Sequence, residues 1–233
     1  MEGKITDIET MGLVDGPGMR LVLFLSGCNL RCQYCHNPET WNLNGNTQTL
    51  SSEDVLKKFK KYSVYYGEHG GVTFSGGEPL MQSKFVLETI KLLKENGIHT
   101  AIDTAGGVGG GYDEVLDLVD LVILDIKAVE ADEYKFITGQ EKTNFDKFLT
   151  ACINKNKKLW LRQVIVPGIN DDESHVKLLK EFAKKIPNVE RIELLPYHSL
   201  GKSKYEELGI EYRLKDTPDM NKQRCSELEK LLK

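Results

Sequence analysis

Three of the five cysteines of this chain lie in one short stretch, at residues 26–38. Cys28, Cys32 and Cys35 form a CxxxCxxC pattern, and the polar residues between them do not make the apolar face of ordinary core cysteines. Cysteines at this density, in a chain otherwise poor in cysteine, indicate thiolate ligation of a metal. Four thiolates normally hold an iron–sulfur cluster, so three would leave one iron open to another ligand.

Two other kinds of site, a zinc site and a redox pair, are also compatible with the cysteine spacing. A zinc site made of the three cysteines and His36 would require the consecutive residues Cys35 and His36 to reach one tetrahedral centre, which is rare. A redox pair formed by Cys32 and Cys35 would leave Cys28 without a role. Both alternatives also leave the polar residues elsewhere in the chain unexplained.

Those polar residues follow predicted strands at the points where the strands end. The residues concerned are Ser75, Gly76, Gly77, Glu78, Asp103, Thr104, Asp125, Lys127, Tyr197 and His198. In parallel α/β folds, the carboxyl ends of the strands form the edge at which ligands bind. We therefore expect these residues to face the cysteine loop across one site.

The glycine-rich segment after residue 75 suits close contact with a ligand. Gly76 and Gly77 let the backbone approach a bound molecule closely, although two glycines also suit an ordinary surface turn. Glu78 could pair with a cationic amine, or could be an acid at a helix N-terminus.

Charged residues at the later strand ends also indicate a site. Asp103, Asp125 and Lys127 would be costly at buried strand ends unless they met charged partners, and an Asp–Lys ion pair explains part of the pattern. Arg162 shares a strand face with apolar neighbours, so it is expected to point inward to a carboxylate or to form a salt bridge at the rim. His198 by itself is as often a satisfied polar residue as a ligand.

The elements that carry these residues alternate along the chain. Strands are predicted at residues 4–10, 19–25, 72–75, 98–103, 121–127, 159–166 and 189–197. Helices are predicted from a capping box at 51–54 to residue 66, and at 83–96, 112–119, 131–137, 145–156, 171–185, 202–208 and 217–233. About six strand–helix units favour an α/β fold with a parallel sheet wrapped by helices. Six units are too few for a closed eight-fold barrel, so we predict a partial (β/α)6 barrel, with a flat doubly wound sheet as the second architecture.

Composition and charge narrow the class of protein. The 233 residues suit a single domain at 1–233, with a short N-terminal strand and turn at 1–18, the cysteine loop at 26–38 and a C-terminal helix at 217–233. The net charge of -4 argues against a general nucleic-acid binder.

We find neither a signal peptide nor an apolar run of the ~20 residues needed to span a membrane. An odd number of mostly clustered cysteines favours a reducing cytoplasm.

The motifs together resemble those of the radical S-adenosylmethionine (radical SAM) superfamily. Tyr34 stands directly before the last cysteine of the pattern, and residues 75–79 resemble the glycine-rich motif that binds the methionyl amino group. Residues 15–20 and 27–37 are similar to the activating enzymes of glycyl-radical enzymes, most closely the branch that acts on pyruvate formate-lyase. Further segments that resemble this branch are 97–100, 103–104, 124–127, 164–168 and 193–198. Ala105 departs from the asparagine that the family often carries, and the glycine-rich segment 106–111 is unusual.

The resemblance implies a mechanism in which the cofactor carries the difficult chemistry. Cys28, Cys32 and Cys35 would hold a 4Fe–4S cluster, and the amino and carboxylate groups of S-adenosylmethionine would bind the fourth iron. A flavodoxin- or ferredoxin-like donor would reduce the cluster, and the 5′-deoxyadenosyl radical would take a hydrogen atom from a glycine Cα of pyruvate formate-lyase. No side chain would need to act as a general acid or base.

The resemblance also assigns roles to individual residues. Contacts with the cluster or with S-adenosylmethionine fall to Tyr34, His36, Gly76, Gly77, Glu78, Asp103, Asp125, Ile126, Lys127, Arg162 and His198. A monovalent-cation site would consist of Asp103, Thr104 and Asp125. Contact with the partner peptide would fall to Asp15, Gly16 and Arg20, although the turn at 15–20 could equally be a rigid structural element.

Two alternative functions are also compatible with the sequence. The first is activation of a different glycyl-radical enzyme, and the second is a non-catalytic zinc or redox protein. Many activases of the dehydratase type carry a cysteine-rich, ferredoxin-like insert, and nothing of that kind lies between Cys35 and Val72. The activases of anaerobic ribonucleotide reductase are usually much shorter. Both features favour pyruvate formate-lyase as the target.

Overall fold

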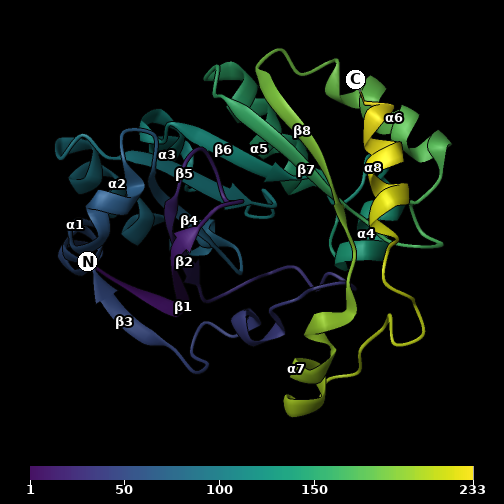
Figure 1. Cartoon of the computed structure of the whole chain (residues 1–233), viewed down its shortest axis with the longest axis horizontal. Coiled ribbons are helices and arrows are strands. Elements are labelled where there is room, and N and C mark those ends of the chain that lie inside the picture. The colour runs from purple at the N-terminus through teal and green to yellow at the C-terminus, as the bar shows by residue number, and fades with distance from the viewer. Residues whose placement is uncertain (233) are drawn as a thin grey trace.

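Six parallel strands form the centre of the protein, which a computed structural model describes for residues 1–232. They are β2 (Arg20–Leu25), β4 (Gly71–Gly76), β5 (His99–Thr104), β6 (Leu121–Asp125), β7 (Leu159–Ile165) and β8 (Val189–Pro196). Each pairs in parallel with the next in that order, so their carboxyl ends lie along one edge of the sheet. The sheet curves and remains open, with β8 at one edge (Figure 1). The predicted partial barrel is therefore confirmed.

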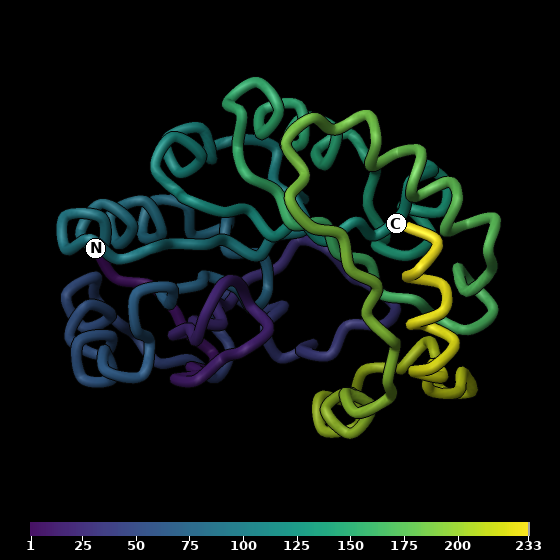
Figure 2. Tube along the Cα trace, turned by 45° about the horizontal axis from the view of Figure 1, so that its top comes forward, coloured from purple at the N-terminus to yellow at the C-terminus, as the bar shows by residue number. Residues whose placement is uncertain are grey.

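Most of the helices lie on the outside of this curved sheet (Figure 2). The helices are α1 (Ser52–Tyr66), α2 (Ser83–Glu95), α3 (Asp113–Leu118), α4 (Ala131–Thr138), α5 (Thr143–Asn154), α6 (Glu173–Ala183), α7 (Lys202–Glu207) and α8 (Lys222–Lys230). The exception is α7, which lies beyond the carboxyl end of β8 and contacts the short helix that follows the cysteine loop (Figure 1). The predicted capping box of α1 is confirmed, because the Ser51 hydroxyl accepts from the Asp54 N–H and the Asp54 carboxylate accepts from the Ser51 N–H. None of the helices in residues 1–232 has the length and apolarity to span a membrane.

Two antiparallel strands extend the sheet beyond β2. β1 (Glu2–Gly12) pairs with β2 on one side and with β3 (Gln48–Ser51) on the other. The sequence predicted the first of these strands at residues 4–10 and missed the second. The missed strand lies at the edge of the sheet and begins with two exposed polar residues, so it lacks the buried apolar alternation that identifies a strand.

The last helix begins later than the predicted residue 217. Its N-cap is Asn221, whose side chain accepts a hydrogen bond from the Arg224 N–H at 3.0 Å. The segment before it is not helical, and the Met220 N–H bonds to the carbonyl of Tyr197 at 2.8 Å. This contact with the chain just after β8 replaces the helical hydrogen bonds that a start at residue 217 would have made. The predicted end at residue 233 lies outside the described residues.

Arg20, at the start of β2, is completely buried. Its Nε donates to Thr73 Oγ1 at 2.6 Å and its Nη2 to the Val72 carbonyl at 2.7 Å, while Nη1 donates to the Pro17 carbonyl at 3.2 Å. The Thr73 hydroxyl in turn donates to the Asp15 carbonyl at 2.6 Å. Burial lowers the pKa of Arg20 to about 10, so the guanidinium stays charged at neutral pH. Arg20 therefore fastens the turn between β1 and β2 to the neighbouring strand β4.

Replacing this guanidinium should destabilise the fold. We expect Arg20→Met to lower the free energy of unfolding by about 3 kcal/mol, because two backbone carbonyls and a hydroxyl lose a charged donor inside the protein. Urea denaturation under anaerobic conditions measures this change. The control is Arg224→Met, which removes a half-exposed guanidinium from α8 and should change the stability by less than about 0.5 kcal/mol. Equal stability of the two variants would show that Arg20 does not hold the turn.

Candidate metal and cofactor site

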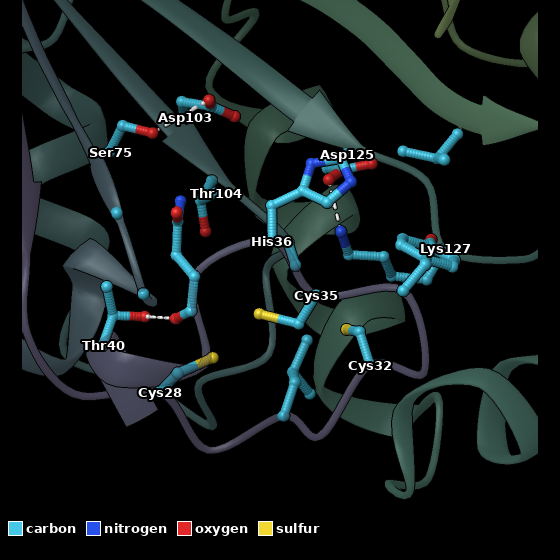
Figure 3. Close-up of a pocket in the computed structure, with 17 residues that line it drawn as sticks. Cys28, Cys32, Cys35, His36, Thr40, Ser75, Asp103, Thr104, Asp125 and Lys127 are labelled. Atoms are coloured by element: carbon cyan, nitrogen blue, oxygen red, sulfur yellow. Dashed lines mark hydrogen bonds and ion pairs between the residues drawn. The ribbon is translucent and has the colours of Figure 1, made fainter. Parts of the chain in front are cut away.

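The cysteine loop and the carboxyl ends of the parallel strands enclose a cavity of about 170 Å³ (Figure 3). The predicted site residues that line it are Cys28, Cys32, Tyr34, Cys35, His36, Gly76, Gly77, Asp103, Thr104, Asp125 and Lys127. The fold thus brings residues from four separate strand ends to one place, as the sequence predicted. Glu78, Ile126, Arg162, Tyr197 and His198 are not part of the lining. The Tyr197 hydroxyl is instead hydrogen-bonded to the Tyr212 hydroxyl at 2.6 Å.

Backbone hydrogen bonds fix the cysteine loop in place. The Arg31 and Gln33 N–H groups donate to the carbonyls of Thr138 and Ile137 at the end of α4, at 2.8 and 3.0 Å. On its other side, the Gly27 N–H donates to the Thr40 carbonyl at 2.7 Å. The loop is therefore held between α4 and the short helix at Pro38–Trp41, although it contains no regular structure of its own.

A second group of contacts holds this loop from the far end of the chain. The Tyr205 hydroxyl donates to the Cys35 carbonyl at 3.0 Å, and Lys204 Nζ donates to Asn37 Oδ1 at 2.9 Å. The rings of His36 and His198 stack with centroids 3.9 Å apart, and His36 Nε2 lies 2.8 Å from the His198 carbonyl oxygen. His198 thus reaches the cavity through His36, and its own Nδ1 is buried without a partner.

The three cysteines are free thiols that face the cavity. Burial is the main cause that raises the pKa of Cys28 and of Cys32 to about 12, and it also raises the pKa of Cys35. Their side chains come together in the lower part of the cavity in Figure 3. Within residues 1–232, no three His, Cys, Asp or Glu side chains form a group that could hold a single metal ion.

The turn after β4 lies directly against the cysteine loop. Gly76 has a φ of 107°, which a residue with a side chain rarely adopts. A Cβ on Gly77 would lie 2.3 Å from the carbonyl oxygen of Gly27 and 3.3 Å from the Cβ of Cys28. Gly77 therefore has to be glycine, because the backbone of the cysteine loop occupies the space that a side chain would need.

Glu78 holds this turn rather than facing the cavity. The carboxylate is completely buried and accepts hydrogen bonds from the Thr104 hydroxyl at 2.6 Å and from the Leu80 and Ala105 N–H groups at 3.2 and 3.1 Å. Burial raises the pKa of Glu78, and these hydrogen bonds act in the opposite direction. Because both carboxylate oxygens already have donors, Glu78 ties the turn after β4 to the end of β5.

One cationic and two acidic side chains line the cavity, and not all of their polar atoms have partners. Lys127 forms an ion pair with Asp125 and lies 5.4 Å from the centre of the Tyr34 ring. The second carboxylate oxygen of Asp125 is buried without a hydrogen-bond partner, as is the hydroxyl of Tyr34. Asp103 accepts a hydrogen bond from Ser75 Oγ at 3.1 Å. Burial is the largest cause that raises the pKa of Asp103 to about 6.

Arg162 lies beside the cavity, against Asp103. Its Nη1 is 4.0 Å from a carboxylate oxygen of Asp103, and its Nε donates to Glu193 at 3.1 Å. It also donates to the carbonyl of Val14 in the turn between β1 and β2. Ile126 is a completely buried residue whose N–H bonds to the Arg162 carbonyl at 2.7 Å.

The turn expected to contact the partner peptide is mostly inside the protein. Asp15 is 9% exposed; burial raises the pKa of its carboxyl, and the charges of Arg162 and Arg20 oppose that shift. Gly16 has a φ of 131°, and a Cβ there would lie 2.9 Å from Arg20 Cδ. Arg20 lies at the amino end of β2, away from the cavity lining.

Several residues that line the cavity were not predicted from the sequence: Leu30, Asn37, Thr40, Ala105 and Val164. Ser75, which begins the glycine-rich motif at a strand end, lines the cavity as expected. The sequence gives no comparable signal for Thr40 or Val164, which are ordinary polar and apolar residues.

The amino-acid sequence matches one family over most of its length. The Radical SAM superfamily matches residues 22–179. The chain is 53% identical to a pyruvate formate-lyase-activating enzyme of Clostridium pasteurianum over 232 residues, which are 99% of this chain and 97% of that protein. It is 41% identical to a pyruvate formate-lyase-activating enzyme of Staphylococcus epidermidis, over 93% of this chain and 89% of that protein.

Solved structures share the fold. A domain of a pyruvate-formate lyase-activating enzyme from Bacteroides vulgatus is similar with a TM-score of 0.56 and 25% identity, over 70% of this chain and 92% of that chain. A radical SAM methyltransferase from Sphaerobacter thermophilus has a TM-score of 0.66 at 14% identity, over 91% of this chain and 63% of its own. The second likeness concerns the fold alone.

The contacts of Glu78 generate a prediction about stability. Glu78→Gln places an NH₂ group against the donors that the carboxylate now accepts, so we expect a loss of about 2 kcal/mol in the free energy of unfolding. Anaerobic urea denaturation measures it, and the exposed Glu114→Gln on α3 is the control. If Glu78 instead served mainly as the partner of a ligand amine, the variant would keep its stability and lose only affinity for S-adenosylmethionine.

Proposed function

Because this chain belongs to the pyruvate formate-lyase-activating enzymes of the radical SAM superfamily, we propose that it installs a glycyl radical on pyruvate formate-lyase. The observation that carries the proposal is the cavity in which three free cysteines face strand-end carboxylates and a lysine. A protein that only stored zinc or exchanged disulfides would not need buried charges opposite its thiols.

We propose that Cys28, Cys32 and Cys35 hold a 4Fe–4S cluster. The donor set fits this group, because three thiols suit three irons and leave the fourth for a second ligand. When bound and reduced, the cluster supplies the electron that cleaves S-adenosylmethionine, giving a 5′-deoxyadenosyl radical that removes a hydrogen atom from the target glycine. The chain's own contribution is to bind and orient these groups and to keep water away from them.

The unpaired polar atoms of the cavity suit S-adenosylmethionine, which carries an amino group, a carboxylate and a ribose. The free carboxylate oxygen of Asp125 can accept from a donor of this ligand, and Lys127 can pair with a carboxylate. Gly76 and Gly77 present backbone without side chains beside the thiols. Glu78 and Arg162 would act indirectly, since their own groups are already engaged within the protein.

A monovalent cation is a further part of the proposal. Asp103 and Asp125 line the same cavity, and the charge of Asp125 is one of the causes that raise the pKa of Asp103. A cation would offset this repulsion. The proposed ligands are the two carboxylates and the Thr104 hydroxyl oxygen, which keeps a free lone pair although it donates to Glu78 and accepts from the Gly106 N–H.

No residue is assigned as a general acid or base. The partner peptide is proposed to thread into the barrel and to contact the turn at residues 15–20, which follows the exposed residues Leu13 and Val14. A flavodoxin- or ferredoxin-like protein is proposed to supply the electron. The free cysteines favour action in a reducing cytoplasm.

Metal analysis of the purified protein tests whether the three cysteines bind a cluster. We expect the protein, purified anaerobically, to be brown and to bind about four irons with matching sulfide. Cys32→Ala should abolish reductive cleavage of S-adenosylmethionine, which product chromatography measures. Cys225→Ala on α8 is the matched control and should keep both iron and cleavage, because Cys225 is not in the cavity lining. A colourless zinc protein, or cleavage that survives in Cys32→Ala, would refute the ligand assignment.

Electron paramagnetic resonance tests the target. With pyruvate formate-lyase, S-adenosylmethionine and a chemical reductant, we expect a glycyl-radical signal that depends on all three components. Pyruvate formate-lyase with alanine in place of its target glycine is the control and should give no signal. A signal from another glycyl-radical enzyme, with none from pyruvate formate-lyase, would show that the other enzyme is the target of this activase.

A further inference from the structure

A second cavity lies behind the cysteine loop, on the side of Cys32. Its volume is about 260 Å³, and Arg31, Trp41, Tyr205 and Arg213 are among the residues that line it. Cys32 lines this rear cavity and also the cofactor cavity, so it forms part of the wall between them. Neither Cys28 nor Cys35 lines the rear cavity.

We propose that the rear cavity is the docking surface for a small acidic electron-carrier protein, and that the electron enters the cluster beside Cys32. This inference rests on the proposed function, because it presumes a cluster at the three cysteines. The transfer is of one electron from the reduced carrier to the oxidised cluster, so the carrier is oxidised by one electron and no bond is formed or broken.

The position of the two cavities gives the first argument. The cofactor cavity has to hold S-adenosylmethionine, and the partner glycine has to approach it from the same side. An electron carrier that used that side would compete with both. The rear cavity is separated from it by the cysteine loop, so a carrier docked there would leave the substrates in place.

Charge gives the second argument. Arg31 and Arg213 both line the rear cavity and are exposed, and Glu211 is the acidic residue in its lining. Arg213 has no ion pair within residues 1–232. The surface is therefore locally positive on a chain whose net charge is -4. Such a patch attracts an acidic partner and raises its association rate in a salt-dependent way.

The lining of the rear cavity is also partly aromatic and held in place by hydrogen bonds. Arg31 Nη1 donates to the carbonyls of Cys28 and Leu30, both at 2.7 Å, and the guanidinium lies 4.8 Å from the centre of the Trp41 ring. Trp41 in turn meets Tyr205 edge to face at 5.8 Å. Fixed aromatic and arginine side chains are typical of the central residues of protein interfaces.

An exposed phenylalanine is joined to the rear cavity through its backbone. Phe136 on α4 is 59% exposed, and its carbonyl accepts from Gln33 Nε2 at 2.7 Å. Gln33 also lines the rear cavity.

The experiment compares two charge reversals on the enzyme loaded with its cluster. Arg213→Glu changes the rear cavity, while Lys60→Glu makes the same change in charge on α1, at an exposed residue outside it. Arg213 is preferred to Arg31, whose hydrogen bonds hold the cysteine loop itself. The probes are flavodoxin hydroquinone, reduced ferredoxin and photoreduced 5-deazariboflavin, a small reductant without net charge. Stopped-flow absorbance measures reduction of the cluster.

We expect Arg213→Glu to lower the second-order rate constant with at least one protein carrier about tenfold and to remove most of its salt dependence. Lys60→Glu should stay within about twofold of the wild type, and all three proteins should be reduced equally by deazariboflavin. Calorimetry with oxidised carrier should show weaker binding to Arg213→Glu, independently of any turnover. Arg213→Gln should give an intermediate rate.

Two results would overturn the inference. One is equal reduction of the wild type and Arg213→Glu by both carriers. The other is failure of both carriers to reduce a wild-type cluster that deazariboflavin does reduce. If deazariboflavin itself reduces no cluster and yields no cleavage of S-adenosylmethionine, the proposed function fails, and this failure is distinguishable from a wrong docking surface.

Discussion

The turn after β4 lies so close to the cysteine loop that no side chain fits between them. The Glu78 N–H donates to the Gly27 carbonyl at 2.8 Å, and the Gly77 N–H donates to the Leu25 carbonyl at the same distance. These bonds set the distance between thiols and strand ends. The parallel pairing of β2 and β4 makes this contact possible, because it brings Leu25 and Gly76 into register at the end of the sheet. A slip of one residue would place the glycines away from the cysteines.

Charged side chains around the cavity are paired with one another, from the lining to the edge strand β8. Asp125 and Lys127 pair at the lining, and Asp103 lies between Ser75 and Arg162. Arg162 also pairs with Glu193 on β8, so Asp103, Asp125 and Glu193 each lie beside a cationic side chain. One carboxylate oxygen of Asp125 and the Tyr34 hydroxyl, both in the cavity lining, are buried without a hydrogen-bond partner. Polar atoms without partners are expected where a ligand completes the hydrogen bonding.

Most of the fold and the centre of the site could be predicted from the sequence, because both depend on local signals. Alternating apolar strands and amphipathic helices gave the parallel sheet, and the strand ends gave Asp103, Asp125 and Lys127 a common position. The side-chain directions of Glu78 and Arg20 could not be predicted. Their hydrogen-bond partners come from other strands and turns, and tertiary structure alone determines which way a side chain at a strand end turns.

The contacts of Tyr205 and Lys204 with the cysteine loop have a consequence for the order of assembly. The partners in these contacts are more than 160 residues apart, and the loop emerges from the ribosome long before the residues that cover it. Strands β2 and β4 can pair early, but the loop stays uncovered on the side of α7 until the chain beyond β8 has been made. Until the C-terminal segment has docked, the cysteine loop therefore lacks the two contacts that Tyr205 and Lys204 make with it.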